Sequence, residues 1–234
     1  MKQYLEQCFL QSGTVRYRIT NDVLAFVTVV SIIAIALETV VAFERYATWF
    51  VVVEWVAVSF FLAEYLGRWY VTRPRRQYVF SFFGIIDLLA IAPTILGLGN
   101  FTFLKAARAV RIIRMLRMLR MAKVSRSDNL QQIEESYGVA GLSVALYGSV
   151  LLFALLIMST LLYVVEPAHS SFTSIPLAMW WSLKVFLGGI AVSAPETFWG
   201  EALLVAARFT GLLLLGLLIG VVGNVFKVMI NGTK

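Results

Sequence analysis

The feature that most constrains this chain is a row of basic residues at every third position from 105 to 126, separated almost wholly by Ala, Val, Ile, Leu and Met. Its eight members, called the basic stripe below, are Lys105, Arg108, Arg111, Arg114, Arg117, Arg120, Lys123 and Arg126. On an α-helix this spacing makes a slow spiral of charge, whereas on a 3₁₀ helix it makes one line along a face. A helix of either kind can slide its charges past fixed partners, as a voltage sensor does.

Most runs of charge are instead solvated basic faces that bind nucleic acid or lipid headgroups. Here the two residues within each of the first six intervals are apolar, which is unsuitable for a wet surface. The stripe also holds eight of the 20 Lys and Arg residues, so the remaining twelve are nearly balanced by 13 Asp and Glu. The net charge of +7 therefore belongs to one segment, and no general basic field exists to attract nucleic acid.

The rest of the composition predicts an integral membrane protein of the all-α class. Hydrophobic residues make up 60% of the chain and the mean hydropathy is +0.83, whereas about half the residues of a soluble domain are apolar. Apolar runs long enough to cross a bilayer predict six transmembrane helices, at residues 21–43, 48–69, 80–98, 101–124, 143–165 and 198–230. A seventh apolar stretch, 175–187, is too short to span and is predicted to be a re-entrant helix.

These runs divide the chain into five parts. We expect a short N-terminal segment at 1–20, a voltage-sensor domain at 21–124, a polar cytoplasmic linker helix at 125–142, a pore domain at 143–230 and a tail at 231–234. The first expected span is preceded by Lys2, Arg16 and Arg18, and the end of the second span and the loop after it carry Arg68, Arg73, Arg75 and Arg76. The positive-inside rule then predicts a multi-pass protein of the cell membrane with both termini in the cytoplasm.

No enzyme, cofactor or metal site is indicated. Cys8 is the only cysteine and His169 the only histidine, and no grouping of nucleophile, base and orienting residue is visible.

The apolar spans contain Glu54, Glu64 and Asp87, and an unpaired carboxylate there is expensive. Glu54 and Glu64 share a broad helical face with Phe61, because spacings of seven and ten residues are about two and three turns. The third acid is Asp87. A ring between two carboxylates would let basic residues pass one at a time, although static ion pairs that merely help the four helices to fold remain the alternative.

Several motifs resemble the voltage-gated potassium channels: Leu-Glu-Thr at 37–39, Val-Glu-Trp at 53–55, Phe61, Glu64, Arg68, Ile-Ile-Asp at 85–87 and Pro93. The resemblance continues in Ser-Ile-Pro-Leu-Ala-Met-Trp-Trp at 174–181 and Thr-Phe-Trp-Gly at 197–200, so it covers nearly the whole chain. It implies that Phe61, Glu64 and Asp87 form a charge-transfer centre, that Glu54 belongs to an outer acidic cluster, and that four copies surround one pore.

The chain departs from the family where the potassium filter, Thr-Val-Gly-Tyr-Gly, would stand. Its own pore and selectivity residues are predicted to be Lys184, Leu187, Gly188, Gly189, Ile190 and Ala191, with Arg208 on the last span. Lys184 lies near the end of the short helix, whose partial negative charge would favour cations, and four copies would reverse that field. Alternatively, Lys184 and Arg208 point away from the axis and pair with Glu166, Glu196 or Glu201.

The last span also carries Gly211, Gly216 and Gly220, which serve either close helix packing or a hinge. Three functions stay open on these grounds. The favoured one is a voltage-gated homotetramer that passes small anions such as chloride; the second is a potassium or weakly selective cation channel; and the third is a non-conducting voltage-sensing subunit. Permeant ions and membrane lipids are the other expected partners.

Overall fold

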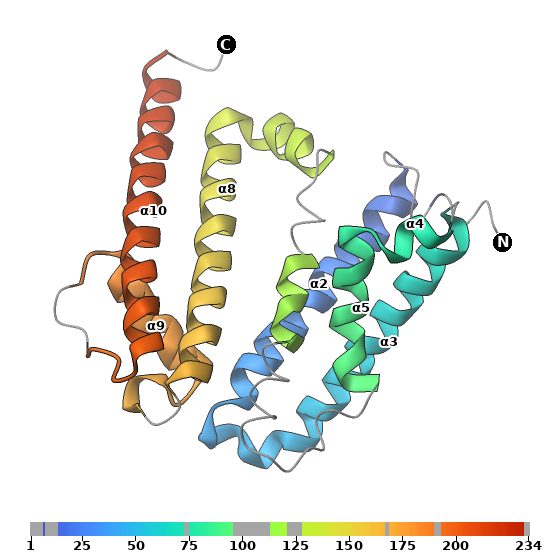
Figure 1. The fold of residues 1–234 in the computed structure, drawn as a ribbon. Helices are drawn as coiled ribbons and strands as arrows, with labels where there is room; N and C mark the ends of the chain where they lie inside the picture. The colour runs from blue at the N-terminus through green and yellow to red at the C-terminus, as the bar shows by residue number, and fades with distance from the viewer. Residues whose placement is uncertain are drawn as a thin grey trace. The chain divides into compact units, whose positions relative to one another are not determined.

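The computed structural model describes residues 7, 14–72, 75–95, 113–120, 128–166, 169–189 and 193–231, and all regular structure in this part of the chain is helical (Figure 1). The expected all-α fold is therefore confirmed for the described residues. The chain divides into two compact units, Met1–Asp128 and Asn129–Lys234. Each unit is described separately below.

The first unit is a helical bundle. Its elements are α2 (Val15–Glu38), the 3₁₀ helix η1 (Val41–Tyr46), α3 (Ala47–Val71), α4 (Arg75–Val79), α5 (Phe82–Ile95) and the 3₁₀ helix η3 (Leu116–Arg120). Helix α3 packs against α2 and α5, and η3 packs against α5 and α2. The buried residues Leu24, Ala57, Val58, Phe61 and Ile91 form the core between α2, α3 and α5.

Helix α2 begins six residues before the first expected span. Thr14 has extended backbone angles and its hydroxyl accepts a hydrogen bond from the Tyr17 N–H at 3.2 Å, which is an N-cap. The helix therefore starts at Val15 and includes Arg16 and Arg18, which lie within the expected N-terminal segment 1–20. Hydropathy detects the apolar length of a span, whereas the cap decides where the helix begins.

The second unit contains α8 (Asp128–Val165), the 3₁₀ helix η4 (Ser170–Phe172), α9 (Ile175–Phe186) and α10 (Phe198–Asn231). Gly138 interrupts α8 with a φ of 67°, so the polar first part is separated from the apolar part that follows. Helix α9 packs on α10 and on η4. Its buried face, which includes Trp181, Val185 and Phe186, joins residues of α8 and α10 in the core of this unit.

The described helices account for most of the expected spans. Four are long and apolar enough to cross a membrane: Val15–Glu38, Val41–Val71, Ala140–Val165 and Phe198–Ile230. The third expected span is represented by the shorter apolar helix Gly84–Ile95, and the expected re-entrant helix by Ile175–Phe186. Of the fourth expected span, 101–124, only residues 113–120 are described.

Candidate functional site

Part of the basic stripe lies within the described residues. The side chains of Arg114 and Arg117 are described, and Arg120 ends the 3₁₀ helix η3. The other five members, Lys105, Arg108, Arg111, Lys123 and Arg126, lie outside the described residues. Residues 116–120 thus form a 3₁₀ stretch of the basic stripe.

Arg117 is completely buried and is bound on several sides. Its Nη1 donates a 2.7 Å hydrogen bond to Oε2 of Glu54, and its Nη2 donates to Oε1 of the same carboxylate. Its Nε donates to the Ala90 carbonyl oxygen at 3.0 Å. A two-pronged pair of this kind is among the strongest side-chain interactions and fixes the guanidinium plane.

Thr94 is a further member of this site that the sequence analysis did not identify. Its hydroxyl donates to Oε1 of Glu54 and accepts from Nη2 of Arg117 at 3.3 Å. Arg114 lies close by, with Nη1 3.7 Å from Oε2 of Glu38 and Nε 3.8 Å from Oε1 of Glu54. Two successive members of the stripe therefore share Glu54, and Glu38 is an additional acidic partner.

Phe61 lies against the Glu54 site. Its side chain is fully buried, and the guanidinium carbon of Arg117 is 5.7 Å from the centre of its ring. Phe61 comes seven residues after Glu54 and three before Glu64, and all three side chains are buried on α3. The broad face expected from the spacing is therefore present, with Arg117 bound to the acid that precedes the ring.

A second charged group, called the Asp87 cluster below, contains Glu64, Arg68, Tyr78 and Asp87. Nη1 of Arg68 donates to Oε1 of Glu64 and lies 3.7 Å from Oδ2 of Asp87. The Tyr78 hydroxyl donates to Oδ2 of Asp87 at 2.8 Å. Burial raises the pKa of Tyr78, and the charge of Asp87 raises it further, so the hydroxyl stays protonated and acts as a donor.

Two members of the Asp87 cluster were missed as site residues. The basic flank predicts only a cytoplasmic position for Arg68, although its position four residues after Glu64 is the spacing of a helical ion pair and indicates the contact. Tyr78 comes from α4, before the span that carries Asp87. Gly84 permits this arrangement, because a Cβ there would lie 1.9 Å from the Tyr78 carbonyl oxygen.

In the second unit, Gly188 and Gly189 end helix α9. Gly188 has a φ of 80° and its N–H donates to the Val185 carbonyl oxygen at 3.0 Å, while the Gly189 N–H donates to the Lys184 carbonyl oxygen at 2.8 Å. This pair of bonds is a Schellman motif, which commonly ends helices at glycine. Both N–H groups of the glycine pair are therefore used to stop the helix. Leu187 is the C-cap residue, and Ile190 and Ala191 lie outside the described residues.

The two basic residues predicted to line the pore, Lys184 and Arg208, are exposed. Among the described residues, no ion pair joins Lys184 or Arg208 to any of the three acids considered as alternative partners. Glu166 is instead buried and accepts hydrogen bonds from the N–H and hydroxyl of Thr197, at 2.7 and 2.6 Å. Burial works against its charge, but these hydrogen bonds hold the pKa of Glu166 below its ordinary value.

Glu166 therefore caps the start of α10. The Thr197 hydroxyl in turn accepts from the Gly200 N–H at 3.0 Å. A Cβ at Gly200 would lie 2.0 Å from Oε1 of Glu166, so the cap needs glycine at this position.

The three glycines expected to serve close packing or a hinge differ in their surroundings. A Cβ at Gly211 would lie 2.7 Å from the Phe186 Cα, so this glycine lets α10 approach the end of α9 closely. No atom lies within 4 Å of the corresponding position at Gly216 or Gly220, and α10 is helical throughout. Close packing is thus the role supported at Gly211.

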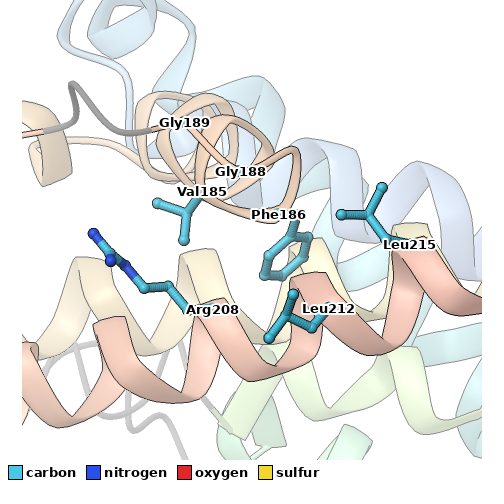
Figure 2. A pocket seen from close by; sticks show the side chains of 7 residues that line it. All are labelled: Val185, Phe186, Gly188, Gly189, Arg208, Leu212 and Leu215. Atoms are coloured by element: carbon cyan, nitrogen blue, oxygen red, sulfur yellow. The ribbon is translucent and has the colours of Figure 1, made fainter.

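A pocket of about 210 Å³ lies between the end of α9 and α10 (Figure 2). Its lining residues are Val185, Phe186, Gly188, Gly189, Arg208, Leu212 and Leu215. Figure 2 shows the Arg208 side chain reaching from α10 past Val185, while the Phe186 ring faces Leu212. No group of His, Cys, Asp and Glu in the described part of the chain is arranged to hold a metal ion.

Comparison with known proteins agrees with the motif analysis. The model of the ion transport protein family matches residues 17–233. The potassium voltage-gated channel protein Shal of Drosophila melanogaster is 30% identical over 188 residues, which cover 79% of this chain and 33% of that protein. The A-type voltage-gated potassium channels KCND3 of Homo sapiens and Rattus norvegicus are each 28% identical over 188 residues, or 79% of this chain and 29% of theirs. The chain spans about a third of the length of these relatives.

Proposed function

The chain belongs to the ion transport protein family, and to the voltage-gated potassium channel superfamily, and on this premise we propose that it forms a voltage-gated channel whose pore passes small anions, chloride in particular. The proposal has two parts, a sensor in the first unit and an anion-selecting pore in the second. Four copies surround the pore, as in the channels that the motifs resemble. The channel lies in the cell membrane with both termini in the cytoplasm.

The sensor part rests on the contacts of Arg117. Its buried guanidinium is bound to Glu54, against one side of Phe61, while Glu64 and Asp87 provide a second acidic site. Movement of the stripe would exchange basic residues between these two sites. Moving one charge across the membrane yields about 2.3 kcal/mol per 100 mV, so three or four charges in each of four sensors supply tens of kcal/mol. The eight members of the stripe provide enough charge for steep gating.

One observation carries the anion-selective part: Lys184 and Arg208 are exposed, and no ion pair of the described residues neutralises them. Lys184 lies in the last turn of α9, where its charge opposes the partial negative charge of the helix end. Glu166, the buried candidate partner, is held by Thr197 instead. Rings of Lys or Arg are one of the means by which pores select anions.

Similarity to voltage-gated potassium channels favours a second candidate, a channel that passes potassium. In that case, Lys184 and Arg208 would lie away from the ion path and residues after Gly189 would form an unusual cation filter. This candidate requires both basic residues to lie off the pathway, because a basic residue beside it would repel cations. The two candidates differ in the sign of the permeant charge and can be separated directly.

The test is the reversal potential of the reconstituted full chain in a potassium chloride gradient. We expect a reversal near the chloride potential for the wild type, and a move away from it in Lys184→Gln. Lys227→Gln is the matched control, since Lys227 is an exposed cation at the far end of α10. A wild-type reversal near the potassium potential would reject the anion pore in favour of the second candidate. Charge movement without ionic current would indicate a voltage-sensing subunit.

A further inference from the structure

The pocket between α9 and α10 contains one charged group in otherwise apolar surroundings. The Arg208 guanidinium is the only charged side chain among its lining residues. The N–H groups of Gly188 and Gly189 are used by the carbonyl oxygens of Val185 and Lys184. A ligand that matches the pocket therefore carries one anionic group for Arg208 and an apolar body for the remaining surface.

The size of the pocket limits that apolar body. An apolar cavity of about 150 Å³ in another protein holds benzene, and this pocket is about 210 Å³. Phe186 is buried and forms a fixed wall, while Leu212 is 66% exposed and leaves an open side. One aromatic ring with a short substituent fits these dimensions.

The depth of Arg208 along α10 distinguishes between two possible ligands, a soluble molecule and a phospholipid headgroup. Phe198 and Trp199, at the start of α10, are 75% and 70% exposed, as expected of aromatic residues at a membrane interface. Arg208 is ten residues further on, which is about 15 Å along the helix and half the thickness of a hydrocarbon core of about 30 Å. Phospholipid headgroups lie at the interface, whereas an arginine at this depth faces a protein interior or a water-filled cavity.

We propose that this pocket binds a small amphiphilic anion from the aqueous phase, namely an aryl carboxylate whose carboxylate pairs with Arg208 and whose ring packs against Phe186 and Leu212. A bidentate pair with the guanidinium orients the carboxylate. The ring removes apolar surface of Leu212 and Leu215 from water. This inference goes beyond the proposed function, because binding does not depend on which ion the channel passes.

The experiment is calorimetric titration of the purified full chain with 4-ethylbenzoate, with 4-ethylbenzamide as the neutral analogue and 4-ethylbenzylammonium as the cation. We expect saturable binding of the carboxylate, at least tenfold weaker binding of the amide, and at least tenfold weaker carboxylate binding in Arg208→Gln. Lys227→Gln should bind as the wild type does. Arg208→Glu should reverse the preference, binding the ammonium compound in place of the carboxylate. Circular dichroism and elution volume establish that each variant is folded and assembled.

Other results overturn the inference. Equal affinity for the carboxylate and the amide would mean that Arg208 takes no part, and displacement of the carboxylate by phosphatidylglycerol alone would assign the site to a lipid headgroup. No binding to a folded, assembled wild type would mean that a neighbouring copy covers the pocket. These results are distinct from the test of the proposed function, since a reversal potential measures permeant charge and the titration measures binding without ion flow.

Discussion

Replacing Glu54 by Gln removes the charge that holds Arg117 while keeping nearly the same shape. The ion pair is buried, with the Arg117 side chain fully buried and that of Glu54 11% exposed. Breaking one partner of a buried pair costs about 3–5 kcal/mol. The Ala90 carbonyl oxygen and the Thr94 hydroxyl still accept from Arg117, so the lower end of that range applies. The state with Arg117 beside Glu54 should be destabilised by about 3 kcal/mol.

This loss of stabilisation can be expressed as a shift in the midpoint voltage of charge movement. If three charges per sensor cross the field, each 100 mV supplies about 7 kcal/mol to that sensor, so a loss of about 3 kcal/mol shifts the midpoint by about 40–45 mV. The orientation proposed from the basic flanks would place Glu54 toward the outside, where stripe charges would move on depolarisation. The midpoint of charge movement should therefore shift to more depolarised potentials. Gating currents in a voltage clamp measure this shift whether or not the pore conducts.

Two further acids make a graded series with Glu54. The side chain of Glu38 is 32% exposed and its Oε2 is 3.7 Å from Arg114, so Glu38→Gln should cost less than about 1 kcal/mol and shift the midpoint by less than about 15 mV. Glu44 is exposed on η1, and Glu44→Gln serves as the control with no shift. The reasoning fails if Glu54→Gln and Glu44→Gln shift the midpoint equally, or if Glu54→Gln favours the depolarised state.

Further substitutions test the structure outside the Glu54 site. Tyr78→Phe removes the donor to Asp87 but keeps the ring, and the loss of a hydrogen bond to a charged group, worth about 1.5–3 kcal/mol, should shift the midpoint of charge movement by about 20–45 mV. Gly200→Ala places a Cβ against Glu166 and should lower the thermal stability of the assembled protein. Gly216→Ala adds a Cβ where no atom lies within 4 Å, and alanine favours a helix more than glycine does, so it should raise the free energy of unfolding by about 0.5–1 kcal/mol. The folded-state pKa of Glu166 lies below the ordinary value of 4.5. The ionised carboxylate therefore contributes fully to the free energy of unfolding above pH 4.5, and this contribution is lost as the pH falls through the lowered pKa. Glu166→Gln should remove this contribution and so reduce the loss of stability measured in acid unfolding.

Features that depend on one helix could be predicted from the sequence, because helical geometry fixes them. The spacing of Glu54, Phe61 and Glu64 predicts a shared broad helical face, and the structure shows that all three residues are buried on α3. The choice of partner for each stripe residue depends instead on the register between segments. Arg117 and Glu54 are 63 residues apart, and no local pattern selects Arg117 from eight equally spaced basic residues.

Partners without charge were the hardest to predict. The Ala90 carbonyl oxygen and the Thr94 hydroxyl bind Arg117, yet neither residue stands out in an apolar span. A buried guanidinium has five N–H donors, and one carboxylate cannot satisfy all of them. The sequence could therefore have predicted that uncharged acceptors surround each buried arginine, but their identity required the packing of η3 against α5.

The end of α9 shows how one pattern can serve two roles. Two adjacent glycines after an apolar helix supply a permissive backbone for an ion filter, and they equally supply a helix stop. The stop requires specific bonds across one turn, and the Gly188 and Gly189 N–H groups make both of them, to Val185 and Lys184. Helix α9 thus ends with a lysine in its last turn, so an exposed positive charge and the partial negative charge of the helix end lie together. A Lys184→Gln substitution leaves only the partial negative charge of the helix end, which favours cations. The selectivity of the pore should therefore change toward cations.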